Sequence, residues 1–242
     1  AERMYHNFPQ VFRGDAFIDA RSSTSLRCAM SMSYFTERLK ELNPGLQVNR
    51  RAYHRYMDYI AYTSPEGETF ASEKAPWRRG FREFEKKNVR PERLMASLFV
   101  KPEAITDQDA MMRSLYWIAA DMQNVELDLS FYDIFEYEEL VGVWKTVNAR
   151  MYVCNAAAPL NGGLMPRCAV PLLRNILESA DAAIEKGTPA ADLRFGHDTH
   201  LIRLLALMQI EGCSNQEVDM EKFHLAWQDY RVSPMGANLQ LI

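Results

Sequence analysis

Several features that define common protein classes are missing from this 242-residue sequence. No apolar stretch reaches the roughly 18 residues that a membrane-spanning helix needs. The first residues lack the basic start and apolar core of a secretory signal peptide, so none is expected within this chain. The formal net charge is only −4, and this balance does not favour nucleic acid or an anionic membrane as a partner.

Cysteine is scarce, and its spacing excludes one common kind of metal site. No two of Cys28, Cys154, Cys168 and Cys213 form the CxxC pair of a zinc knuckle. The even number would permit two disulfides, but buried free thiols explain it equally well in a chain of this size. Internal repeats and low-complexity segments are also absent. With 48% hydrophobic residues, the chain can form one large domain or a core with an insertion.

The most informative stretch is a predicted junction between a strand and a helix near residues 190–212. Residues 190–195 can form a short buried strand after the break at 187–189. Apolar residues then recur at the spacing of one helix face, and Gly212 is expected to end that helix. The turn between them carries His197 and Asp198 at the carboxyl end of the strand, where open α/β sheets bind ligands. The helix N-terminus there suits an anion, and the two side chains supply a cation and a proton donor.

A second unit of the same kind lies near the start of the chain. Residues 16–20 predict a short strand, and residues 21–27 form a polar turn rich in serine and threonine. A helix follows, with one apolar face, and residues 43–45 (Asn-Pro-Gly) are expected to end it. The turn carries Arg21 and Arg27, whose guanidinium groups match the oxygens of a phosphate or carboxylate.

The remaining chain predicts the domain organisation. Residues 46–160 are dominated by aromatic and charged residues with few strand signals, and the spacing predicts helices near 76–87, 107–122 and 138–152. A helix over 169–186 returns the chain to the sheet, and residues 236–242 predict an apolar strand. The expected fold class is therefore α/β: a partial, doubly wound mixed-sheet core (1–45 and 161–242) with a large inserted all-helical domain (46–160).

Two motifs in the predicted turns resemble the histidine phosphatase superfamily, in its acid phosphatase and phytase branch. Residues 21–28 resemble the signature R-[ST]-[ST]-x-x-x-R followed by a small residue, and residues 196–201 resemble the late motif G-H-D-x-x-[IL]. Their order and separation also fit, because that branch carries a helical domain between them. The resemblance implies hydrolysis of a phosphomonoester through a phosphohistidine, without a cofactor or metal. Inositol phosphates, sugar phosphates and other small phosphomonoesters are the implied substrates, and an exported protein, periplasmic or secreted, is the implied location.

The resemblance also implies a role for individual residues. Arg27 would clamp the phosphoryl oxygens, and His197, if protonated, would be a second cation on them. Asp198 would be the general acid that protonates the leaving alkoxide, a step that contributes roughly 10²–10⁴-fold. Thr199, His200 and, in the earlier motif, Arg21 would contact these groups and hold them in position without touching the substrate.

One element of the family pattern is missing. The nucleophilic histidine of the family lies in R-H-G-x-R-x-P on an earlier strand, and nothing in residues 1–242 matches that motif. We therefore expect a fragment that lacks the nucleophile and is inactive alone. A core without that strand would expose a sheet edge, which predicts a homodimer, strand exchange or low stability. The alternative is a non-catalytic relative that binds a phosphorylated ligand or another protein.

Structural explanations compete with these assignments. His197 and Asp198 could simply cap the helix, and His197 with His200 could suggest a metal pair, although no third ligand has suitable spacing. Arg27 could be a solvated arginine at a helix start, a position that disfavours basic residues unless an anion is nearby. Arg21 fits a surface ion pair as well as a supporting role. Three basic pairs are expected to be solvated, although one of them could reach a polyanionic substrate: Arg50-Arg51, Arg78-Arg79 and Lys86-Lys87.

Overall fold

The computed structural model describes residues 1–242 and contains one three-stranded parallel sheet. The strand order is β2-β1-β3, with β1 (Phe17–Ser22) in the centre, β2 (Gln47–Arg51) on one side and β3 (Ala191–Phe195) on the other. Ile18 of β1 is in register with Val48 of β2 and with Ala191 of β3. Parallel strands need crossover connections, and helices provide them here. The expected α/β class is thus confirmed, but the sheet is parallel and not mixed as expected.

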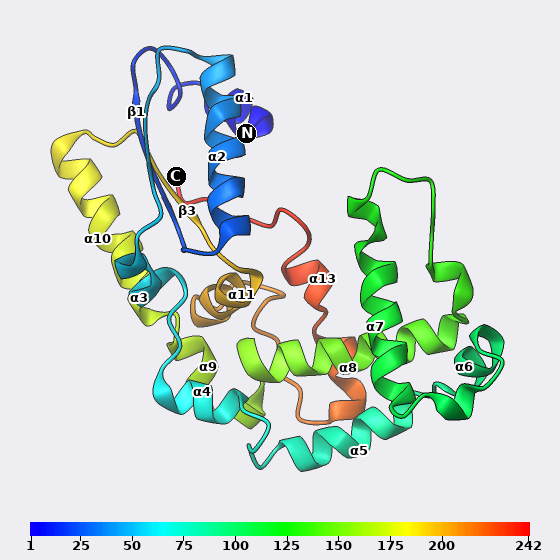
Figure 1. Ribbon diagram of the computed structural model, residues 1–242. Helices are drawn as coiled ribbons and strands as arrows, with labels where there is room; N and C mark the ends of the chain where they lie inside the picture. Colours follow the sequence, from blue (N-terminus) through cyan, green and yellow to red (C-terminus); the bar gives the residue numbers. More distant parts are fainter.

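Helices cover both faces of this sheet and form a separate lobe beside it (Figure 1). The α-helices are α1 (Glu2–Asn7), α2 (Leu26–Leu42), α3 (Met57–Ile60), α4 (Pro65–Ala71), α5 (Arg78–Asn88), α6 (Glu92–Leu98), α7 (Gln108–Asp121), α8 (Tyr137–Asn155), α9 (Leu164–Arg167), α10 (Val170–Lys186), α11 (Asp198–Leu207), α12 (Phe223–Ala226) and α13 (Asp229–Val232). A 3-10 turn, η1 (His54–Tyr56), precedes α3.

The two faces of the sheet differ in chemistry. Ile18 is fully buried in a cluster with Leu39 of α2, so the α2 face is apolar. On the opposite face, Arg194 of β3 donates hydrogen bonds to Asn175 of α10. Because side chains alternate along a strand, Asp19 and its neighbours at odd positions of β1 lie on this polar α10 face. The sheet is therefore covered on both sides, as the doubly wound prediction requires.

The predicted domain boundaries need two corrections. Residues 47–51 were expected in the helical insertion, but they form strand β2 and pair with β1. The segment Gln-Val-Asn-Arg-Arg has only one apolar residue, so its sequence gives almost no indication of a strand. An edge strand tolerates such a composition because it is only partly buried. The C-terminal segment was expected in the α/β core, but Phe223 and Trp227 pack against Tyr152 of α8. Between β2 and β3 the chain contains only helices and connecting segments.

Two apolar clusters hold the helical lobe together. One joins α5, α8, α11 and α12, and the other joins α6 and α7 to the first half of α8. The helices α5 and α8 approach closely at Gly142, where a Cβ atom would lie 2.1 Å from the backbone oxygen of Asn88. Only glycine permits this crossing.

Three local predictions are also wrong. Helix α11 ends at Leu207, before Gly212, and Gln209 follows it with a φ of 55°, in the left-handed region. The strand β3 is only partly buried along its whole length because it forms an edge of the sheet. Residues 236–242 form no strand; Leu239 packs between core clusters while Ile242 is 90% exposed.

The four cysteines are free, and three of them are buried. Burial of unpaired thiols is common because cysteine behaves as a small apolar residue. Of the two interpretations that the sequence allows, the structure agrees with free thiols. None of the helices is both long enough and apolar enough to cross a bilayer.

Candidate functional site

The two predicted turns meet at the carboxyl ends of β1 and β3. The N–H of Ser23 donates to the carbonyl of Phe195 at 3.0 Å, which joins the two chain segments directly after the strands. Beyond this bond, Nη2 of Arg27 lies 2.9 Å from Nδ1 of His197, although the two residues are 170 positions apart. Arg27 is in the first turn of α2, and His197 immediately precedes α11. The fold thus brings together the two residues that the motifs single out.

The contact with Arg27 favours one protonation state of His197. A guanidinium can only donate, so Nδ1 of His197 must accept, and the ring proton of the neutral imidazole is then on Nε2. Nε2 lies 3.5 Å from Oγ of the buried Ser23, at the limit of a hydrogen bond. Partial burial lowers the pKa of His197, the nearby Arg27 lowers it further, and Asp198 acts in the opposite direction. Without an anion, these effects favour the neutral ring that accepts from Arg27.

Cys28 of α2 contacts the same imidazole. Its thiol is 95% buried and donates to the carbonyl of Gly196 at 3.2 Å, and its sulfur lies 3.8 and 3.9 Å from the two ring nitrogens of His197. Gly196 is also held from the other side, because a Cβ there would lie 3.0 Å from Cγ2 of Ile60. These contacts hold the turn and the ring in position.

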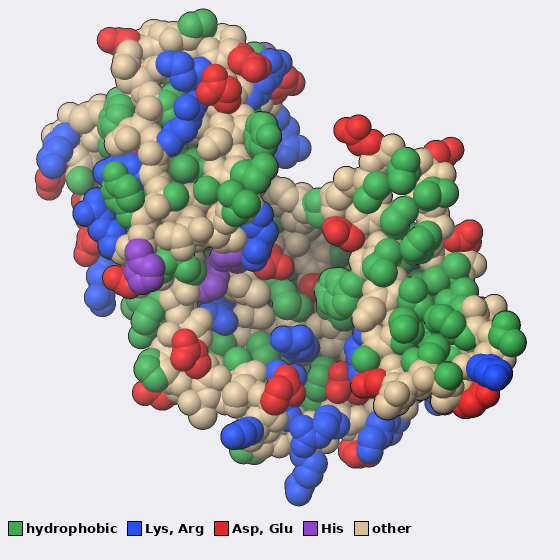
Figure 2. All heavy atoms as spheres, viewed as in Figure 1, with side chains coloured by type: hydrophobic (Ala, Val, Ile, Leu, Met, Phe, Trp, Pro, Cys, Tyr) green, Lys and Arg blue, Asp and Glu red, His purple; other side chains and the backbone are tan.

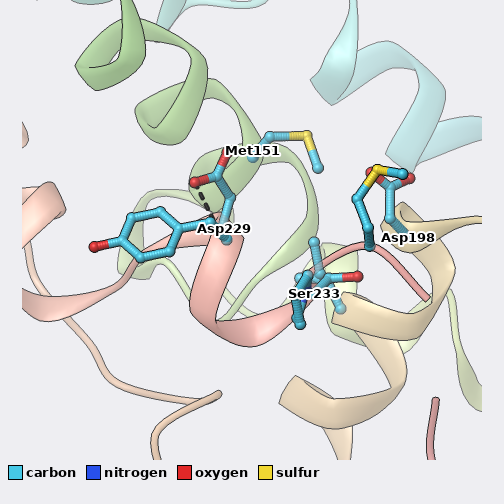
Figure 3. Close-up of a pocket in the computed structure, with 8 residues that line it drawn as sticks. Met151, Asp198, Asp229 and Ser233 are labelled. Atoms are coloured by element: carbon cyan, nitrogen blue, oxygen red, sulfur yellow. Dashed lines mark hydrogen bonds between the residues drawn. The ribbon is translucent and has the colours of Figure 1, made fainter. Parts of the chain in front are cut away.

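Asp198 lies beside His197 but faces a different environment. It is the first residue of α11, is exposed, and accepts the N–H of the adjacent Thr199 at 2.8 Å, whereas the N-cap residue is His197, whose side chain forms no cap bond. It also lines a pocket of about 210 Å³ between α8, α11 and α13 (Figure 3). Met151 of α8 and Asp229 and Ser233 of the α13 segment lie across this pocket from it. The carboxyl group is therefore available to a ligand as well as to the helix end.

Asp229 is the second carboxylate of this pocket. Its Oδ1 accepts from Nε1 of Trp144 at 3.0 Å and from the N–H of Tyr230 at 2.9 Å. These bonds fix its position on α13, and Figure 3 draws the one within that helix. The pocket lining contains four hydrophobic residues and no lysine or arginine.

The other predicted site residues, Thr199, His200 and Arg21, do not touch Arg27 or the pocket beside Asp198. Oγ1 of Thr199 lies 3.2 Å from Nδ1 of His200, and this second imidazole is largely buried with its Nε2 unpartnered. Arg21 lies on the α10 face of the sheet, where it bonds to Asp19 at 2.8 Å and has no contact with Arg27 or His197. No cluster of three or more His, Cys, Asp or Glu side chains could hold a metal ion.

Some residues of the site have little or no signal in the sequence. Ser23 and Cys28 are within the quoted motif, but their contacts with His197 follow only from the fold. Asp229 and Ser233 belong to a C-terminal segment that shows no motif, and the packing of α12 on α8 brings them to the pocket. Figure 2 shows the surface hollowed between the sheet lobe and the α6–α7 part of the helical lobe, with charged side chains of both signs along its floor.

Comparison with known proteins identifies the fold. No family model and no curated protein matches the sequence. The structure is similar to that of multiple inositol polyphosphate phosphatase from Bifidobacterium longum in its apo form, with a TM-score of 0.74 and 17% sequence identity. The fold is histidine phosphatase-like.

The similarity extends over nearly the whole chain but not over the whole of that enzyme. It covers 96% of this chain and 65% of the Bifidobacterium protein. The same values hold for the structure of that protein with phosphate, and the structure with inositol hexasulfate gives a TM-score of 0.73 at 16% identity. At such low identity the similarity establishes only the fold of this chain and not its activity.

Proposed function

We propose that this chain forms the phosphate-binding and proton-donating part of a phosphomonoesterase. The observation that carries the proposal is the contact between Arg27 and His197 at the ends of adjacent parallel strands. An arginine without an ion pair, beside an imidazole and a helix N-terminus, is a suitable site for a tetrahedral dianion. Neighbouring structures with the same fold carry a phosphatase name, and one of them binds phosphate.

The reaction follows from the positions of three groups. Arg27 holds two phosphoryl oxygens through its planar fork and stabilises their charge in the transition state. His197 gives up its bond to Arg27 and donates from Nε2 or, when the bound dianion protonates it, from both nitrogens. Asp198, one residue further on, donates a proton to the leaving oxygen, which favours an acidic optimum.

The pocket beside Asp198 is the proposed place for the leaving group. Asp198, Asp229 and Ser233 supply oxygens there, and the apolar lining supplies shape. Because the lining has no basic side chain, it suits a leaving group with hydroxyl groups better than one with a phosphate next to the scissile ester. Sugar phosphates and inositol phosphates with free neighbouring hydroxyls fit this requirement.

The nucleophile is proposed to come from sequence outside residues 1–242. The chain has no Arg-His-Gly motif, and the outer edge of β3 pairs with no other strand. A further parallel strand on that edge would end beside His197, where a nucleophilic histidine is required. Export from the cytoplasm is part of the proposal. If the edge stays open, pairing with a second copy would give a dimer, and a monomer by light scattering would count against that pairing.

The first test is phosphate release from p-nitrophenyl phosphate near pH 5. Residues 1–242 are compared with a longer chain that includes the upstream residues of the same gene. We expect activity only in the longer chain. Activity of residues 1–242 alone would contradict the missing nucleophile, and inactivity of both, when both are folded and bind phosphate, would favour the non-catalytic binding relative.

Variants of the active form then test the individual roles. Asp198→Asn removes the proton donor and should lower kcat by roughly 10²–10⁴-fold for an alkyl phosphate. The loss should be much smaller for p-nitrophenyl phosphate, whose leaving group needs little protonation. Arg27→Gln should weaken phosphate binding about tenfold or more. Arg82→Gln is the matched control because Arg82 is exposed on α5 and forms no ion pair. Equal losses on both substrates for Asp198→Asn would contradict the role of general acid.

A further inference from the structure

A second pocket, of about 330 Å³, lies where the α10 face of the sheet meets η1 and α3. It shares no lining residue with the pocket beside Asp198. Its lining is polar and cationic and comes from five different elements: Arg21, Arg51, Arg55, Tyr56, Tyr59 and Asn175. The proposed phosphomonoesterase site uses none of these groups.

Strand register brings the arginines together. Arg21 of β1 is in register with Arg51 of β2 and with Arg194 of β3, so a row of three guanidinium groups crosses the sheet on one face. Like charges on neighbouring strands destabilise a sheet unless opposite charges compensate them. Two residues earlier on β1 and β3 lie two carboxylates, Asp19 and Asp192, which are also in register with each other.

These carboxylates compensate the arginines only in part. Asp19 is 4% exposed and accepts from both Arg21 and Arg51, while Asp192 pairs with Arg194 at 3.3 Å. With Arg55 at the rim, four guanidinium groups face two carboxylates, which leaves an excess of two positive charges. The pocket lining itself contains no carboxylate.

Several donors in the pocket remain free. Nε of Arg51 is buried without a hydrogen-bond partner, which costs free energy and shows that the two carboxylates do not satisfy this guanidinium completely. Asn175 accepts from Arg194 through its oxygen, so its NH₂ group has no partner within the protein. Arg55 forms no ion pair or hydrogen bond and is held only by the rings of Tyr53 and Tyr56, at 5.1 and 5.4 Å.

We propose that this pocket binds a small soluble polyanion with at least two phosphate groups. The free donors are guanidinium and amide N–H groups, which match phosphate oxygens. The excess of two positive charges needs a ligand with more than one negative charge, and the volume exceeds that of a single phosphate ion. This site would regulate the protein or hold a ligand apart from the candidate active site.

Calorimetric titration with inorganic tripolyphosphate at low salt tests the proposal. The protein carries Arg27→Gln throughout, so that the anion site at His197 is weakened. We expect Arg55→Gln to weaken tripolyphosphate binding about tenfold, because one charge-assisted contact is lost. Arg55 forms no ion pair or hydrogen bond in the fold and touches only two tyrosine rings, so this variant should lose little stability. Arg82→Gln on α5 changes the net charge equally and should bind like the parent.

Three outcomes would overturn the proposal. Equal affinity of the parent and Arg55→Gln would place the ion elsewhere on the surface. No binding of tripolyphosphate at millimolar concentration would mean that the arginine row is purely structural. The third outcome is binding to phosphatidylcholine vesicles that contain a few per cent of a phosphoinositide, measured by co-sedimentation. If this binding is tighter than the binding of tripolyphosphate and is lost in Arg55→Gln, the pocket belongs to a lipid headgroup.

Discussion

Acid should destabilise this protein through His200, in the first turn of α11. Its Nδ1 lies 3.2 Å from Oγ1 of Thr199, and its Nε2 is buried without a hydrogen-bond partner. Burial lowers the pKa of His200 from 6.5 to about 4, the charge of the buried Arg203 acts in the same direction, and the backbone of Ala61 and Tyr62 opposes the shift only in part. The neutral imidazole is therefore the form that the fold accepts.

The sign and size of the effect follow from linkage. The unfolded chain binds a proton at His200 below about pH 6.5, whereas the folded chain resists protonation until about pH 4. Stability is thus complete above pH 6.5 and is lost as the pH falls through this window. With these pKa values for the unfolded and the folded chain, His200 alone lowers the free energy of unfolding by about 2 kcal/mol when the pH falls from 7 to 5. The loss reaches about 3 kcal/mol when the pH falls to 4. This is a large part of the 5–15 kcal/mol typical of a domain.

Urea denaturation followed by tryptophan fluorescence at pH 7, 6 and 5 measures this effect. His200→Gln removes the titrating ring. Between pH 7 and pH 5 the free energy of unfolding of the wild type should therefore fall by about 2 kcal/mol more than that of the variant. His54→Gln, at an exposed histidine of η1, is the control. Parallel stability curves for wild type and His200→Gln would refute the reasoning. Phosphatase assays near pH 5 should include a check of folding for the same reason.

Three further variants test the packing and capping of the helical lobe by thermal or urea denaturation. Gly142→Ala places a Cβ 2.1 Å from the backbone oxygen of Asn88 and should cost about 1–3 kcal/mol or more. Gly80→Ala on α5 has no atom within 4 Å of the new Cβ and should stabilise by about 0.5–1 kcal/mol; equal effects at the two glycines would contradict the close crossing of α5 and α8. Asp107→Ala removes the carboxylate that accepts from the N–H of Ala110 at α7 and should cost about 1 kcal/mol, and an unchanged midpoint would show that this cap contributes nothing.

Local patterns determined those parts of the structure that depend on neighbouring residues. The strand at 17–22, the helix that follows it and the long helix at 170–186 agree with the spacing of apolar residues and with the turn residues beside them. Asp107 caps α7, a position at which aspartate is favoured. The two turns that carry Arg27 and His197 could be identified because each combines a strand end, a helix start and a short motif. The α/β class follows from these local elements.

Tertiary structure alone decided how these elements meet. The contact of Arg27 with His197, the neutral state of that ring and the burial of His200 depend on atoms far apart in the sequence. Strand β2 has one apolar residue, so only its pairing with β1 makes it a strand, and that register aligns Arg51 with Arg21. Asp229 reaches the pocket beside Asp198 only because the C-terminal helices pack on α8. Periodicity reports which face of an element is buried, but the partner of that face is set by packing across the whole chain.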